Sequence, residues 1–276
     1  MAITATEFPT EYREALDEVL LGATYCGKYH VQGAEFVNNR QVSVPSISFG
    51  ETPEPEDYNR FKTEGDATVS RKVYTLQYDK QKKFYGDAVD AIDEAATSAT
   101  TVISEYLRTV FAPYEDKLFF QSIVTNAPKE KAKQYTGTTL LTADNIKQEL
   151  RKVRKQFTQA GLRAGDLYMT SDALALLEDA TNRQWGNDGA INDIVGQYDG
   201  FNIYEVADAT LGTDFTAVAN GVESIRYITK RAVSYLFMPG QHTEGDGWMA
   251  QMRWVFGHIA LDNKKVALYT HKGAQG

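Results

Sequence analysis

Three potential metal ligands lie close together near the C-terminal end of the chain. His242, Glu244 and Asp246 occupy alternate positions, which would bring their side chains to one side of an extended segment. A hard cation needs more oxygen ligands than these, usually from a defined loop. Because glycines interrupt the segment, we interpret it as a polar turn between two strands and predict no metal site.

Candidates for a nucleophile or a general base are equally sparse. The single cysteine, Cys26, has a lysine two residues away but no assembled histidine or asparagine partner, so we predict a small packing residue. His258 lies in an apolar strand pattern and is predicted to be a hydrogen-bonded core residue. His271 lies near the C-terminus, where we expect it to be solvated.

Familiar catalytic and cofactor motifs are missing from the sequence. It has no Gly-rich dinucleotide or phosphate loop, no nucleophile elbow, no HExxH and no CxxC. Acidic pairs such as Glu178 and Asp179 occur, but a sequence does not place a pair across a cleft, and we expect them on exposed helix faces. We therefore predict no enzyme and no catalytic, cofactor or metal site. An intracellular enzyme is the less favoured alternative.

The charge balance argues against two further classes of protein. Lys and Arg number 29, and Asp and Glu number 37, which gives a formal net charge of −8. A nucleic-acid binder needs surplus cations to displace counterions, and an anionic membrane attracts basic surfaces. No apolar stretch reaches the ~18 residues of a membrane helix, and the N-terminus lacks a signal-peptide pattern. We expect an intracellular, soluble protein that is held together by packing.

The elements that could position a functional surface include a predicted hairpin arm over residues 41–83. Apolar residues form an extended run over 42–49, and a period-two strand follows over 73–78. Between them lies a polar stretch with two prolines. A two-stranded hairpin is at best marginally stable alone, so the arm should lie on another surface. A short amphipathic helix over 10–21 likewise needs a partner, either its own body or a neighbour.

Charges are separated along the predicted arm. The loop between its strands is acidic. Its first four acidic residues in the sequence, here named the acidic tip, are Glu51, Glu54, Glu56 and Asp57. A second polar excursion contains the lysine segment, which comprises Lys129, Lys131 and Lys133. One interpretation is a solvated, charged loop. The hypothesis that we adopt is that the acidic tip contacts the lysine segment of a neighbouring copy.

The rest of the chain predicts helices followed by mixed strands. Apolar residues recur at three- and four-residue spacing from 87 to 124, which predicts a long spine helix that Pro113 breaks or kinks. A helix with a basic outer face is predicted from Thr142 to about Ala160, ended by Gly161. Its inward-facing residues are predicted to be Ile146, Leu150, Val153 and Phe157. From Asp166 onward strand patterns alternate with helices, which predicts an α+β body without repeats.

This order of elements resembles the major capsid protein of tailed bacteriophages, which has the Hong Kong 97-type fold. The local likeness lies in the C-terminal half. Residues 166–177 resemble the family's strand-then-helix unit, and residues 196–206 resemble its glycine turn and following strand. Residues 231–236 and 255–269 resemble its last strands.

The resemblance implies five regions along the chain. They are an N-terminal arm (1–40), an extended-loop hairpin (41–83), a peripheral domain with the spine helix (84–138), an axial domain (139–250), and C-terminal strands that return to the peripheral domain (251–276).

The resemblance also implies a function and partners. The chain would be a coat protein that self-assembles through hexamers and pentamers into the icosahedral head shell around double-stranded DNA. Assembly would take place in the host bacterial cytoplasm, and the product is the virion head. Because the arm begins at Met1, a separate scaffolding protein is expected, together with a portal; decoration proteins and covalent cross-links stay open. Packaged DNA would be touched only weakly and non-specifically. The alternative with the same fold is an intracellular nanocompartment shell.

Overall fold

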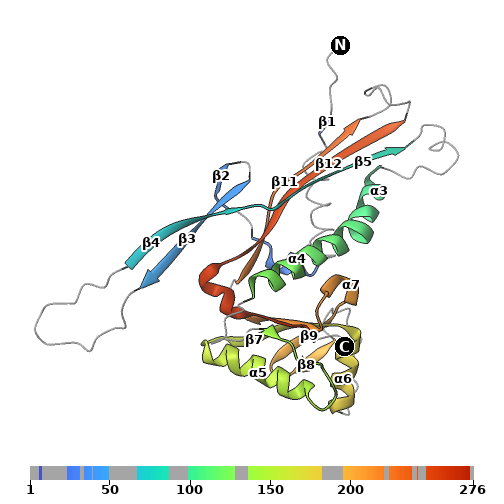
Figure 1. Ribbon diagram of the computed structural model, residues 1–276. Coiled ribbons are helices and arrows are strands. Elements are labelled where there is room, and N and C mark those ends of the chain that lie inside the picture. Colours follow the sequence, from blue (N-terminus) through green and yellow to red (C-terminus); the bar gives the residue numbers. More distant parts are fainter. Residues whose placement is uncertain are drawn as a thin grey trace, which may run out of the picture.

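The protein is described here from a computed structural model. It describes residues 6–7, 24–31, 34–38, 40–49, 67–86, 99–127, 136–181, 195–220, 224–237, 241 and 247–273. Strands in these ranges form three sheets, and the long helices pack against two of them (Figure 1). The helix predicted over 10–21 and the turn predicted at 242–246 lie outside the described residues.

Long antiparallel strands form a four-stranded sheet. In spatial order its strands are β1 (Thr6–Glu7), β11 (Ile225–Phe237), β12 (Trp248–Ala260) and β5 (Tyr78–Gly86). β12 lies at the centre and pairs with both β11 and β5. β11 and β12 follow one another among the described strands and pair along their length, from Ile225–Ala260 to Phe237–Met249.

The arm is a separate sheet of three antiparallel strands that projects from the body (Figure 1). Its strands are β2 (Phe36–Asn38), β3 (Gln41–Phe49) and β4 (Ala67–Thr75). The returning strand differs from the expected 73–78. β4 ends at Thr75, and the chain enters the four-stranded sheet at Tyr78. The apolar pattern over 73–78 therefore spans the junction between two sheets.

A compact lobe is built on a six-stranded sheet. In spatial order its strands are β6 (Thr136–Gly137), β13 (Leu268–His271), β10 (Phe215–Asn220), β7 (Arg163–Met169), β9 (Phe201–Glu205) and β8 (Gly196–Tyr198). Both faces of the sheet are buried. In β7, Leu167 and Met169 face one core and Tyr168 faces the other, because successive side chains point to opposite faces.

Two helices, α5 (Ile146–Gln159) and α6 (Ser171–Thr181), cover the outer face of this sheet (Figure 1). The buried side of α5 has the predicted spacing and comprises Ile146, Leu150, Val153 and Phe157. The helix begins later than predicted because residues 142–145 form a turn, in which the Thr142 N–H donates to Asn145 Oδ1 at 2.8 Å. Gly161, with a φ of +74°, follows its end.

The spine helix runs between the two large sheets. It consists of α3 (Ala99–Tyr106), a π-helical turn (Leu107–Phe111) and α4 (Ala112–Asn126). Of the two predicted effects of Pro113, a break does not occur: helical structure continues from Ala99 to Asn126, with the π-helical turn directly before the proline. The Ala112 N–H donates to the Leu107 carbonyl five residues back, and Pro113 occupies the first turn of α4, where a missing N–H costs little. The predicted helical residues 87–98 lie outside the described residues.

Three short helical segments complete the described fold. They are a 3₁₀ turn at Cys26–Tyr29, α7 (Asp208–Leu211), and a 3₁₀ segment at Asp262–Ala267 that joins β12 to β13. None of the helices in the described ranges is long and apolar enough to cross a membrane.

Two strands belong to a different sheet from most of the region in which the resemblance places them. β11 falls in the expected axial range 139–250 but belongs to the four-stranded sheet. β13 falls in the expected C-terminal range 251–276 but pairs with β10 and β6 in the compact lobe. Strand patterns in the sequence indicated these strands, yet a strand's partner is decided by long-range packing that the pattern does not contain.

Gly257 allows the close approach at the junction between arm and sheet. A Cβ at this position would lie 3.1 Å from the Cα and from the Cδ2 of Leu76. We expect Gly257→Val to lower the free energy of unfolding by about 1–3 kcal/mol, because the Leu76 backbone must move away. Chemical denaturation measures this difference. An unchanged denaturation midpoint would contradict the close packing described here.

Candidate functional site

The residues predicted to make contacts between subunits lie outside the described residues. The acidic tip follows β3 and precedes β4, whose outermost described pair is Phe49–Ala67. The lysine segment lies between α4 and β6. Their contact therefore stays a prediction. The described residues do define how the arm that carries the acidic tip is fixed to the body.

An apolar cluster fixes the root of the arm. It joins β3 and the β4–β5 junction to the four-stranded sheet, and every member is at most 7% exposed. The members are Val42, Val44, Leu76, Ile228, Val255, Ile259 and Leu261. Burial of these apolar side chains holds the root of the arm on the body.

Asp79 of β5 is the centre of a charged contact at the same root. Its carboxylate accepts hydrogen bonds from Arg253 Nε at 2.9 Å and Arg253 Nη2 at 2.6 Å, and another from Arg40. The hydrogen bonds from Arg253, followed by those from Arg40, lower the pKa of Asp79 to about 2. Because Arg40 lies in the turn between β2 and β3, the contact joins the arm to the sheet.

Two lysines add further contacts between arm and body. Lys72 of β4 pairs with Asp262, which also receives Lys265 at 2.7 Å. Lys230 of β11 donates to the Asn38 carbonyl and lies 4.8 Å from the ring centroid of Phe36. Each exposed pair contributes little stability by itself. Their distribution on both sides of the arm nevertheless restricts the direction in which it projects.

The outer face of the arm exposes apolar side chains. Val37, Val69 and Val73 are 58%, 64% and 48% exposed. Val69 and Val73 lie four residues apart on β4, so both point to the same face of the strand. Exposed β-branched residues on a projecting strand are available for contact with another protein. We define Val37, Val69 and Val73 as the valine face.

Residues 24–31 bind to the body of the same chain. Lys28 Nζ donates to Asp166 Oδ2 of β7 at 2.6 Å, and the Tyr29 hydroxyl donates to the same oxygen at 3.1 Å. The Cys26 N–H donates to Asp116 Oδ1 of α4 at 3.1 Å. The segment thus connects the compact lobe to the spine helix.

Predictions for two histidines are corrected by the structure. His258 is buried as expected, but within the described residues neither ring nitrogen has a hydrogen-bond partner. His271 is fully buried rather than solvated: its ring stacks on Phe215 with centroids 4.8 Å apart, and its Nδ1 lies 2.9 Å from Asp214 Oδ2. The reason is that β13 inserts at an inner position of the six-stranded sheet.

The root contact of Asp79 was not found by the sequence interpretation. Its only signal is that Asp79 is the one acidic residue among the lysines of β5. That pattern shows an unusual charge but does not identify Arg40 and Arg253, which are 39 and 174 residues away in the sequence.

The pKa of Asp79 makes the root contact dependent on pH. We expect Asp79→Asn to lower the unfolding midpoint at pH 7, since both arginines lose their anionic partner. The folded-state pKa is depressed, so the stabilisation is fully present above the unfolded-state pKa and is lost as the pH falls through about 2. Thermal unfolding of both proteins from pH 7 to pH 2 measures it. A difference that does not shrink toward pH 2 would argue against the assignment.

Comparisons with known proteins give matches in structure but none in sequence. No family model matches the chain, and no curated protein matches it. The capsid structure of the cyanophage P-SCSP1u is 11% identical, covers 90% of this chain and 87% of its own, and has a TM-score of 0.62. The mature capsid of bacteriophage PhiM1 is 11% identical, with coverages of 92% and 88% and a TM-score of 0.62.

A third similar structure is a virus-like particle from Pyrococcus furiosus. It is 14% identical, covers 95% of this chain and 98% of its own, and has a TM-score of 0.56. In each case at least nine-tenths of this chain is covered. The chain therefore has the Hong Kong 97-type fold of tailed-phage capsid proteins.

Proposed function

We propose that the chain is the major capsid protein of a tailed phage. It self-assembles into the icosahedral head shell that encloses double-stranded DNA, and its place is the virion head. The observation that carries the proposal is the fold, shared with phage capsids over at least 90% of the chain. Its role is structural rather than catalytic.

The arm supports this function independently of the fold comparison. Its root is buried and tied to the body, whereas its valine face is exposed. A projecting surface of this kind offers a contact to another copy without any change in the body. Many weak contacts of one type, repeated around a closed shell, add up to a stable particle.

Within this proposal the arm corresponds to the extended loop at 41–83, and the compact lobe to most of the axial domain. Hexamers and pentamers are the assembly units, and the acidic tip contacts the lysine segment of the adjacent subunit. A separate scaffolding protein and a portal act during assembly in the host cytoplasm. The net charge of −8 leaves packaged DNA weakly held.

Assembly of the purified chain tests the proposal together with the valine face. We expect capsomers or shells for the wild type by size-exclusion chromatography and negative-stain microscopy. We expect at least a tenfold loss of assembled material in the double variant Val69→Glu, Val73→Glu, because charged groups cannot be desolvated at the contact. The double variant Val69→Thr, Val73→Thr keeps the branched shape and is the matched control, with an intermediate loss.

Thermal unfolding separates assembly from folding in these variants. Val69 and Val73 lie in exposed positions, so the unfolding midpoint should change little in either double variant. A wild-type protein that forms only a small discrete oligomer would contradict the capsid function. Normal particles from the glutamate variant would exclude the valine face as a contact.

Charge reversal tests the acidic tip. Replacing its four acidic residues with lysine should block particle formation while leaving the unfolding midpoint unchanged, because like charges would then face each other. A second reversal, of the lysine segment to glutamate, should restore particles in the combined variant. Normal shells from the first variant, or no rescue in the combined variant, would refute the contact.

A genome-free shell is the second candidate function. The reason to retain this candidate is the match to the virus-like particle from Pyrococcus furiosus, which covers 98% of that chain. The two candidates differ in what the particle contains. Nuclease-protected double-stranded DNA in particles from the native host supports the phage capsid, and enclosed protein without DNA supports the nanocompartment.

A further inference from the structure

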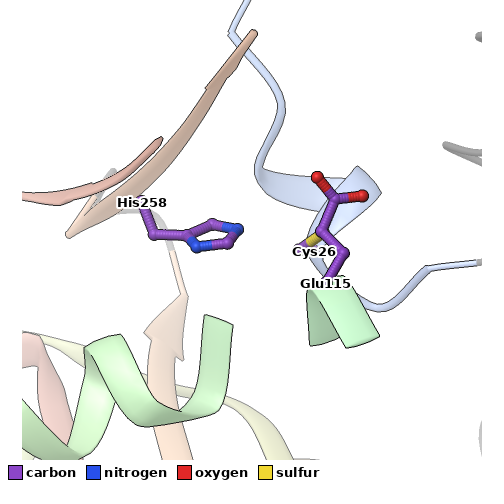
Figure 2. A group of neighbouring side chains, drawn as sticks. All are labelled: Cys26, Glu115 and His258. Atoms are coloured by element: carbon purple, nitrogen blue, oxygen red, sulfur yellow. The ribbon is translucent and has the colours of Figure 1, made fainter. Parts of the chain in front are cut away.

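Three side chains of metal-binding type meet in the core beside the spine helix. Cys26 comes from the 3₁₀ turn, Glu115 from α4 and His258 from β12, and their ligand atoms all lie within 4.8 Å of one another. Figure 2 shows the His258 ring pointing from its strand toward Cys26 and Glu115. The three residues are 0%, 0% and 1% exposed. Three segments distant in the sequence thus deliver a sulfur, an oxygen and a nitrogen ligand to one place.

His258 supplies an independent sign that the site takes a ligand. Its Nδ1 and Nε2 are both buried and lack a hydrogen-bond partner among the described residues. A buried polar group without a partner is costly and calls for an explanation. Burial also lowers the pKa of His258 to about 3, so the imidazole is neutral and a nitrogen lone pair is free to bind a cation.

The orientation of the His258 ring is set by aromatic neighbours. Tyr227 stacks on it with centroids 5.4 Å apart, and Phe119 meets it edge-on at 5.6 Å. The Ser122 hydroxyl donates to the His258 carbonyl at 3.2 Å, which holds the backbone against α4. A ligand whose ring is fixed before binding loses little entropy when the cation binds.

The anionic groups around Cys26 complement a cation. Burial raises the pKa of the Cys26 thiol, and the carboxylates of Glu115 and Asp116 raise it further. The Cys26 N–H donates a hydrogen bond to Asp116 Oδ1 at 3.1 Å, and this bond fixes the position of the Cys26 backbone. A divalent cation would reverse the electrostatics: the thiolate and the Glu115 carboxylate carry two negative charges, which a 2+ ion neutralises inside the core.

We propose that Cys26, Glu115 and His258 bind one Zn²⁺ ion. A thiolate, an imidazole and a carboxylate are zinc ligands, whereas Mg²⁺ and Ca²⁺ prefer sites made of oxygen alone. Three protein ligands leave the fourth position of a tetrahedron to water. The thiol proton is released to solvent on binding. Because the site is buried, the ion binds as residues 24–31 dock, and its binding free energy stabilises the fold.

Metal content and cobalt substitution test this site on the full-length chain. After treatment with a chelator, the protein is titrated with Zn²⁺, and bound metal is counted by mass spectrometry. We expect one Zn²⁺ per chain and a rise in the unfolding midpoint on binding. Co²⁺ should give a thiolate-to-cobalt charge-transfer band. Cys26 is the single cysteine, so this band reports on no other residue.

Variants distinguish loss of the ligand from loss of the fold. His258→Phe should weaken Zn²⁺ binding at least about 100-fold, beyond the 10–100-fold effect of an outer partner. Its metal-free form should be no less stable than the metal-free wild type, because the ring fits the same aromatic surroundings and has no unpaired nitrogen. Cys26→Ser should abolish the charge-transfer band. His30→Gln, which changes a half-buried histidine beside Tyr227, is the matched control and should bind as the wild type does.

Two results would overturn the proposal. One is a wild-type protein that binds less than one-tenth of an equivalent of Zn²⁺ and gives no charge-transfer band. The other is equal Zn²⁺ binding by wild type and His258→Phe, which would place the ion elsewhere on the chain. Zn²⁺ content and the charge-transfer band do not depend on particle formation. They therefore test the zinc site whether or not the chain forms a capsid.

Discussion

The rest of the structure depends on one constraint, which is that the chain passes directly from a strand of the arm into a strand of the four-stranded sheet. β4 belongs to the arm and β5 to the four-stranded sheet, with only two residues between them. The second sheet accommodates this passage because β12 has a glycine where Leu76 crosses it. A junction this short has little freedom of its own. The packing of the body therefore sets the direction of the arm, and with it the place where the valine face is presented.

Both large sheets contribute side chains to the core that surrounds the spine helix. Phe256 comes from β12, and Tyr168 comes from β7 of the compact lobe. Phe119 and Phe120 of α4 lie between them, and the ring centroids of Phe120 and Tyr168 are 5.2 Å apart. Residues 24–31 pass through the same region. Shared burial of this kind holds the two sheets at a fixed relative position.

The sequence predicted local structure better than it predicted partners. The spacing of Ile146, Leu150, Val153 and Phe157 correctly indicated the buried side of α5, and the fold class followed from the order of elements. The sequence did not decide whether Pro113 breaks or kinks the helix; helical structure continues through it, and the adjoining π-turn is a feature that no periodicity reveals. Sheet membership could not be predicted, because it depends on pairing between strands far apart in the chain.

The same limit applies to the sites. The root contact joins residues up to 174 positions apart, and the proposed zinc ligands come from three separate segments. A short spacing, such as that of His242, Glu244 and Asp246, attracts attention because it is visible in one line of sequence. Ligands gathered by tertiary folding have no such spacing and are found only when the elements are placed in space.

Among the described strands, β5 forms one outer edge of the four-stranded sheet, and its exposed stretch includes Lys80, Lys82 and Lys83. An open edge presents unpaired backbone groups to any extended chain that it meets. If two copies met edge to edge, rows of ammonium groups would be brought together, and their repulsion opposes fusion into a continuous sheet. Lysines on an edge strand are one of the devices by which folded proteins oppose edge-to-edge aggregation, and they leave the other surfaces available for ordered association.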